Sequence, residues 1–276
     1  MLRHSTFDKY YKSIVAKHDA KMAAQLRKQI EAGIDNYKSS GAIGQLPTDG
    51  INDAITALFT DAAVMWGRYV QKTLPKVEEK KSEGLDQFIR IVKKFFSYYF
   101  MDRSVTQITE TTRAFMLQVI NDGIDNGLGE DEIVRNLRES NLTNARARLI
   151  TRTETGRAMN TGAMLSAATS RVVMDKVWIS AQDNRTRRLP RDNYDHLHMN
   201  GKQVPYDGVF VVPSTQSIDL MSYPGDSAGS AGNVCNCRCT VAFVPKRDAS
   251  GNLQLVDLNN PTQRNNIYRS IVLNNS

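Results

Sequence analysis

The sequence predicts an α+β protein, in which an N-terminal helical region is followed by a small mixed α/β C-terminal domain. Apolar residues recur at three- and four-residue steps through much of the first half of the 276-residue chain, which is typical of amphipathic helices. Beyond residue 171 the pattern changes to short β-branched and apolar runs separated by loops, which is typical of strands. Because the helices precede the strands and do not alternate with them, we expect α+β order.

The composition excludes several classes of protein. Hydrophobic residues make up 41% of the chain and charged residues 24%, as in ordinary globular proteins. No apolar run approaches about 18 residues, so we expect no membrane-spanning helix and no membrane partner. The N-terminal segment MLRHSTFDKYYK lacks the apolar core of a secretory signal. Three cysteines are too few for a disulfide framework.

The first two helices are predicted from apolar stripes on either side of a loop. A stripe over residues 5–38 predicts the first helix. The segment 39–50 interrupts it with three glycines and a proline. Thr48 or Asp49 can cap the second helix, which carries apolar residues from Ile51 to Tyr69.

Two further helices follow a charged segment. Residues 74–84 (LPKVEEKKSEG) are interpreted as a linker. The third helix runs from Leu85 to Phe100 and has a broad aromatic face, which indicates a central position in a bundle or at an interface. A fourth helix is expected over about 105–126. We interpret the stripes of all four helices as core packing, because no cofactor motif accompanies them.

The second half begins with two helices and continues with short strands. Residues 126–140 predict a short capped helix, and residues 143–169 predict a long helix rich in Ala, Arg and Thr. The run 172–180 (VVMDKVWIS) predicts a strand. Further strand candidates are KQVPYDG, VFVVP, CTVAFVP and GNLQLVDL (251–258). The polar ending from residue 259 is interpreted as a tail that becomes ordered only on a partner.

Positive charge is concentrated in the second half of the chain. The net charge is +7 in total, with 20 basic and 19 acidic residues in 1–140 but 16 basic and 10 acidic residues in 141–276. The basic residues change from 12 Lys and 8 Arg to 3 Lys and 13 Arg. Guanidinium groups suit phosphate and carboxylate recognition. Both a polyanionic partner and a solvated basic surface are compatible with this pattern.

Several enzyme classes lack their motifs. The sequence contains no HExxH, no GxxxxGK[ST] and no GxSxG segment, which argues against a zincin, a P-loop motor and an α/β-hydrolase. A ββα-metal nuclease needs a second histidine downstream of DHLHMNG, and the chain has none there.

Cysteine and histidine residues form the sharpest local feature. Cys235, Cys237 and Cys239 lie in NVCNCRC, about 40 residues after His196 and His198. Thiolates and imidazoles are the usual ligands of zinc, so these residues predict a structural zinc site. Two alternatives stay open. The cysteines can be buried and reduced beside surface histidines, or a redox link can join Cys237 to Cys239.

A second set of polar residues lies in the long helix and after the first strand. Glu154 and Arg157 are one helical turn apart, so their side chains can face Asp183 or Arg185 across a shared cleft. We expect a structural network that locks helix to strand. The alternative is an enzyme that grips a nucleotide. The expected network consists of Arg152, Glu154, Arg157, Asp183, Arg185 and Thr186.

Five segments in a fixed order resemble the phage Mu F-like minor head protein family of tailed bacteriophages. They are GLGEDEIVRNLRE, ARARLITRTETGRAMNTGAM, VWISAQDNRTR, HLHMNG and FVVPSTQSIDLMSYPGDSAGSAGNVCNCRC, and they cover about residues 125–245. The resemblance implies that His196, Cys237 and Cys239 are family positions and that Cys235 and His198 are additions. Many relatives carry a further cysteine pair after Asp-x-Arg-Thr, where this chain has RLPRDNYD.

The resemblance also implies an organisation and a function. Residues 1–125 become a helical docking region, 126–248 the Mu F-like minor head domain, and 249–276 a C-terminal strand and polar tail. Family members are minor capsid proteins of the virion, at the capsid interior or portal vertex, and occupy the host cytoplasm during assembly. The expected partners are the phage portal protein, capsid proteins and double-stranded DNA, bound non-specifically through its phosphates.

The resemblance therefore implies action in head morphogenesis and genome ejection, without catalytic residues. Some relatives carry toxin or enzymatic extensions after this domain. Because the chain ends about 30 residues past the last motif, we expect the structural form of the family without such an extension. One alternative is a phage-delivered toxin enzyme, ADP-ribosyltransferase-like or nuclease-like, that uses Arg152, Glu154 and Asp183. Another is a DNA-binding protein without capsid affinity.

Overall fold

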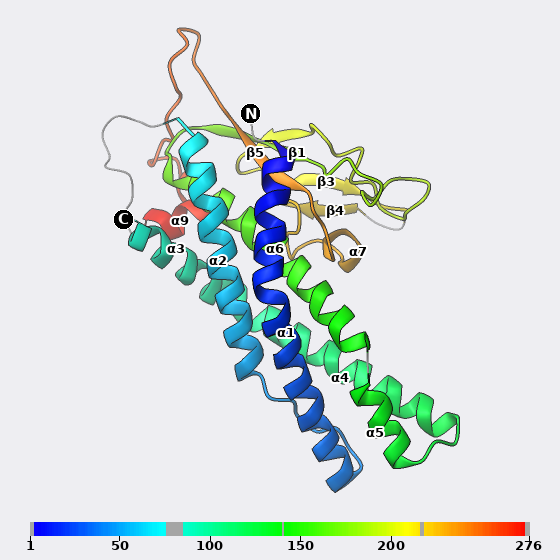
Figure 1. Cartoon of the computed structure of the whole chain (residues 1–276). Coiled ribbons are helices and arrows are strands. Elements are labelled where there is room, and N and C mark those ends of the chain that lie inside the picture. Colours follow the sequence, from blue (N-terminus) through cyan, green and yellow to red (C-terminus); the bar gives the residue numbers. More distant parts are fainter. Residues whose placement is uncertain (1–2, 76–84, 140, 216–217, 274–276) are drawn as a thin grey trace.

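The computed structural model describes residues 3–75, 85–139, 141–215 and 218–273. Long helices make up the N-terminal part of the chain, and small antiparallel sheets follow them, so the α+β class is confirmed. The sheets lie at one end of the long helices, and the short helix α5 lies toward the other end (Figure 1). Within the described residues, no helix is both long enough and apolar enough to span a bilayer.

The four helices of the first half form where the apolar stripes predict them. They are α1 (His4–Ser40), α2 (Asp49–Thr73), α3 (Leu85–Tyr99) and α4 (Met101–Asp125). Helix α4 begins four residues before the predicted start. Thr48 occupies the N-cap position of α2, but its side chain makes no capping hydrogen bond. Most of the predicted linker, residues 76–84, lies outside the described residues.

Helix α6 (Asn141–Thr169) is the central helix of the fold, and the short α5 (Glu130–Arg138) precedes it. Small residues on α6 allow α2 to approach closely. A Cβ atom added to Gly162 would lie 2.1 Å from the backbone oxygen of Ala63. The Ser166 hydroxyl of α6 donates a hydrogen bond of 2.7 Å to the carbonyl of Gly67, which like Ala63 belongs to α2. Small residues at positions such as Gly162 and Ser166 of α6 are therefore a requirement of its packing against α2.

Two antiparallel sheets complete the second half. In the first, β1 (Met174–Ile179) lies between β2 (Gln203–Pro205) and β5 (Thr240–Pro245), with Val177 opposite both Gln203 and Ala242. The second pairs β3 (Phe210–Pro213) with β4 (Ile218–Met221). Strand β4 and the one-turn helix α7 (Ala231–Val234) were not predicted.

The C-terminal segment differs from its prediction. Residues 251–258 form no strand and contribute only the isolated bridges that join Leu253 to Arg247 and Leu255 to Val172. The predicted tail instead contains α8 (Pro261–Arg264) and α9 (Ile267–Leu273). Tyr268 is buried and its ring stacks on Phe95 with centroids 5.1 Å apart. Apolar residues at i, i+3 and i+4 of α9 thus find a surface on the core, which local polarity concealed.

One hydrophobic cluster joins the two halves of the chain. It extends from Phe7 on α1 to Val272 on α9 and includes residues of α2, α3, α4 and α6. A smaller cluster lies between the C-terminal part of α1, α4 and α5. A third surrounds Trp178 and includes Cys237 and Cys239. The predicted division at residue 125 falls at the last residue of α4.

Candidate metal centre

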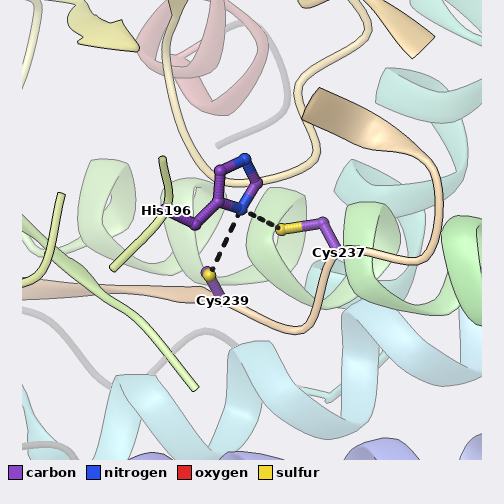
Figure 2. Close-up of side chains that lie close together, drawn as sticks. All are labelled: His196, Cys237 and Cys239. Atoms are coloured by element: carbon purple, nitrogen blue, oxygen red, sulfur yellow. Dashed lines mark hydrogen bonds between the residues drawn. The ribbon is translucent and has the colours of Figure 1, made fainter. Parts of the chain in front are cut away.

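His196, Cys237 and Cys239 meet in the third cluster, although the histidine precedes the cysteines by about 40 residues. His196 lies in the loop between β1 and β2, and the cysteines lie between α7 and β5. Nδ1 of His196 is 3.6 Å from Sγ of Cys237 and 3.6 Å from Sγ of Cys239. Figure 2 shows this ring nitrogen facing both sulfurs. All three side chains are buried, and their ligand atoms lie within 4.8 Å of one another.

Two polar residues orient the imidazole. The Nε2 atom of His196 is 3.0 Å from Oδ1 of Asn233. Asn233 in turn donates from Nδ2 to Oδ2 of Asp219 over 2.6 Å. The amide oxygen of Asn233 therefore accepts from Nε2–H, and the lone pair of Nδ1 faces the two sulfurs.

The carboxylate of Asp219, which orients Asn233, accepts further hydrogen bonds. Ser230 donates to Oδ2 of Asp219 from its backbone nitrogen over 2.7 Å and from its hydroxyl over 2.6 Å. Burial raises the pKa of Asp219, but the hydrogen bonds from Ser230 and Asn233 lower it further than burial raises it. Asp219 is therefore an ionised anchor at the start of β4, and it fixes Asn233 and through it the ring.

The two thiols interact as a pair. Hydrogen bonding from Cys239 lowers the pKa of Cys237 well below its ordinary value, and His196 lowers it further. The pKa of Cys239 is raised well above its ordinary value, first by the hydrogen bond to Cys237 and then by burial. Cys237 is therefore the sulfur that favours the thiolate form in the absence of an added ion.

The cysteine segment is attached to α6 by hydrogen bonds. The backbone nitrogen of Asn236 donates to the Thr153 hydroxyl over 2.8 Å. The buried amide of Asn160 donates to the Cys239 carbonyl over 3.1 Å and accepts from the Val241 nitrogen over 3.1 Å. The ring of Trp178 packs edge-on against His196 at a centroid distance of 5.4 Å. These contacts hold in place both the cysteine segment and the imidazole ring of His196.

Two other predicted ligands lie outside the cluster. His198 is exposed, and its backbone nitrogen donates to Asp195. Cys235 is only partly buried, and its carbonyl accepts a hydrogen bond from Arg187. All three cysteines are free in the structure. Of the five residues considered, the structure thus brings together the three that the resemblance designated as family positions.

The residues of the expected polar network form two separate groups of contacts. Glu154 accepts two hydrogen bonds from Nη1 of Arg157 at 2.8 and 2.9 Å, and Arg157 also donates to the Gly225 carbonyl. Asp183 instead pairs with Arg238. Each carboxylate thus has its own guanidinium partner, and no hydrogen bond or ion pair among the described residues joins Glu154 or Arg157 to Asp183 or Arg185.

The remaining predicted network residues have local roles. The backbone nitrogen of Arg185 and the hydroxyl of Thr186 both donate to Oδ1 of Asp183, which closes a tight turn. The pKa of Asp183 is lowered, chiefly by its hydrogen bond from Arg238. The carbonyl of Arg152 accepts a hydrogen bond of 3.1 Å from the Tyr11 hydroxyl.

Sequence reasoning missed Asn233, Asp219 and Trp178. None carries a motif that singles it out, and Asn233 is 37 residues from the ring that it orients. The only available signal was the position of Asn233 two residues before the first cysteine.

Residues 115–242 match the family model described as phage Mu protein F like protein. The chain is 31% identical over 128 residues to the minor head protein GP7 of Bacillus phage SPP1. This alignment covers 44% of the chain and 37% of the relative's length. No solved structure matches the chain. The matched segment contains His196, Cys237 and Cys239 as well as Glu154 and Asp183. Residues 115–242 of this chain are therefore similar to the phage Mu protein F like family, which confirms the resemblance found in the sequence.

Proposed function

We propose that this protein is a minor head protein of a tailed bacteriophage and a component of the virion. The observation that carries the proposal is the family match over residues 115–242, together with a relative named as a minor head protein. The matched segment runs from the second half of α4 to β5, so it includes α6 and both sheets.

We further propose that the protein acts by assembly and not by turnover. The two carboxylates of the enzyme alternative already have internal partners. Glu154 is 6% exposed and pairs with Arg157 on its own helix. Asp183 pairs with Arg238 and accepts the hydrogen bonds of a turn. These contacts favour structural roles for both groups, because a carboxylate used in catalysis has to reach a substrate.

The proposed docking partner of the helical region 1–125 is the phage portal protein, in contact with the capsid proteins. Residues 1–125 carry a small net charge, with 18 basic and 15 acidic residues, which suits a protein partner better than a polyanion. The test is co-expression of the full chain with the portal protein, followed by size-exclusion chromatography. We expect co-elution, and separate elution at micromolar concentrations of both proteins would overturn the docking proposal.

Contact with packaged double-stranded DNA is a separate part of the proposal. Several arginines of the second half are used inside the fold, such as Arg157 with Glu154 and Arg269 with Asp207. Arg185 and Arg188 differ, because both are exposed and neither guanidinium has an ion-pair partner among the described residues. We propose that these two side chains contact DNA phosphates.

The DNA contact is tested through its salt dependence. The double variant Arg185→Ala/Arg188→Ala is expected to reduce the slope of log K against log salt by about 2, close to 0.9 per lost phosphate contact. Arg264→Ala is the matched control, since Arg264 is also exposed but lies at the C-terminal helix α8. An unchanged slope in the double variant, or an equal change in the control, would remove these side chains from the proposed interface.

The proposed locations follow from the same role. We place the protein in the mature virion, at the capsid interior or portal vertex, and in the host cytoplasm during assembly, with participation in genome ejection. Mass spectrometry of purified particles, before and after DNA release, tests the virion location and the participation in genome ejection. Absence of the chain from intact particles would contradict the virion location, and unchanged retention after release would contradict a role as an ejected protein.

A further inference from the structure

We propose that His196, Cys237 and Cys239 bind one zinc ion, with a water molecule as the fourth ligand. The inference concerns the stability and shape of this domain and does not depend on the proposed role in the phage head. Zinc favours tetrahedral sites built from thiolate and imidazole ligands. The structure brings such a set together from two segments that are distant in the sequence.

The distances between the ligand atoms match those of a tetrahedral zinc site. Zinc bonds of about 2.3 Å to sulfur and about 2.0–2.1 Å to nitrogen place sulfur and nitrogen about 3.6 Å apart at a tetrahedral angle. The observed separations from Nδ1 of His196 are 3.6 Å to Sγ of Cys237 and 3.6 Å to Sγ of Cys239. The two sulfurs also lie within 4.8 Å of each other, so one ion between them can contact all three ligand atoms.

The surroundings of the histidine are those of a metal ligand. A ligating imidazole normally donates its other N–H to a fixed acceptor, which sets the tautomer and the ring plane. Here Nε2–H of His196 donates to Asn233, which Asp219 orients. The lone pair of Nδ1 is thus directed at the position between the two sulfurs, as Figure 2 shows.

A buried donor near the cluster also fits a metal-bound thiolate. The indole Nε1–H of Trp178 has no hydrogen-bond partner among the described residues, although the side chain is fully buried. The Trp178 side chain packs in the same buried cluster as Cys237 and Cys239. A zinc-bound thiolate accepts such hydrogen bonds better than a neutral thiol does, and it would satisfy the indole.

A small recess of about 10 Å³ adjoins the cluster and supplies the fourth position. The three ligands line this recess together with Arg185, Arg187 and Arg238, among others. No other Cys, His, Asp or Glu of the described residues joins the group of three. A site with three protein ligands and an open position takes solvent as its fourth ligand. Binding releases the thiol protons, so two negative sulfurs face the doubly charged ion.

The experiment measures zinc in the full-length protein. Wild type, Cys237→Ser and the matched control Cys235→Ser are expressed in zinc-supplemented medium, dialysed against metal-free buffer and analysed by inductively coupled plasma mass spectrometry. We expect about one zinc per chain in wild type and in the control, and at least a tenfold lower content in Cys237→Ser. Circular dichroism shows whether each variant is folded.

X-ray absorption spectroscopy on the wild type keeps the proposal testable if Cys237→Ser does not fold. We expect two sulfur neighbours at about 2.3 Å and two nitrogen or oxygen neighbours at about 2.0–2.1 Å. Less than a tenth of a zinc per wild-type chain would overturn the proposal, as would a Cys237–Cys239 disulfide detected as the loss of two hydrogens. Three or four sulfur neighbours, or loss of zinc from Cys235→Ser, would overturn the ligand set. None of these results changes co-elution with the portal protein, so the two proposals fail independently.

Discussion

The ion pair between Glu154 and Arg157 gives the sharpest test of whether the polar residues of α6 are structural. The side chains of Glu154 and Arg157 are 8% and 7% exposed. Their nitrogen and oxygen atoms are 2.8 and 2.9 Å apart, and Arg157 also donates to the Gly225 carbonyl over 3.1 Å. The pair therefore joins α6 to the segment after β4. Replacement of Glu154 by Gln leaves the guanidinium charge buried without a counter-charge.

The expected cost follows from this uncompensated charge. Removal of one partner of a buried pair costs about 3–5 kcal/mol, and we expect about 3 kcal/mol because the Gln amide oxygen still accepts a hydrogen bond. At about 2–4 °C per kcal/mol for a chain of this size, the melting temperature falls by roughly 6–12 °C. Thermal unfolding followed by circular dichroism measures this shift, and denaturant titration measures the free energy of unfolding.

Helix α5 offers a matched control. Glu132 and Arg135 have the same i,i+3 spacing, with atoms 3.5 Å apart, but their side chains are 51% and 58% exposed. Glu132→Gln is expected to cost less than about 1 kcal/mol, as exposed pairs do. If Glu154→Gln is no more destabilising than Glu132→Gln, the burial argument is refuted. If Glu154→Gln stays fully stable but abolishes turnover of NAD or cleavage of DNA, the enzyme alternative is favoured.

Three further outcomes are expected. Asp183→Asn lowers the melting temperature at pH 7. Because the folded-state pKa of Asp183 is depressed, the difference in melting temperature between wild type and variant declines as the pH falls below the ordinary pKa of 3.8. A difference in melting temperature that persists unchanged at pH 2 contradicts this linkage. Gly162→Ala costs about 1–3 kcal/mol or more in denaturant titrations, because the added Cβ overlaps the Ala63 backbone; a neutral result means that α2 and α6 can separate freely. Cys237→Ser lowers the melting temperature more than Cys235→Ser, and equal melting temperatures would remove any special role for Cys237.

The short-range pattern of the sequence was sufficient to predict most of the helices and to find the family resemblance. A stripe at three- and four-residue steps defines one apolar face, so α1 to α4 could be predicted without knowledge of their partners. The same reasoning failed for the C-terminal segment, where α9 is short and polar residues surround Tyr268 and Ile271. Burial of these two side chains on the core, and not local propensity, stabilises α9.

By itself, the sequence determined the α+β order, the positions of the long helices and the presence of a Cys-x-Cys segment with two histidines upstream. Only the tertiary structure decided that His196 and not His198 faces the sulfurs, and that Glu154 and Asp183 belong to separate groups. Helical periodicity is a local property of the chain. Pairings across about 40 residues depend on the path of the loops, and that path is fixed by packing against α6 and β1.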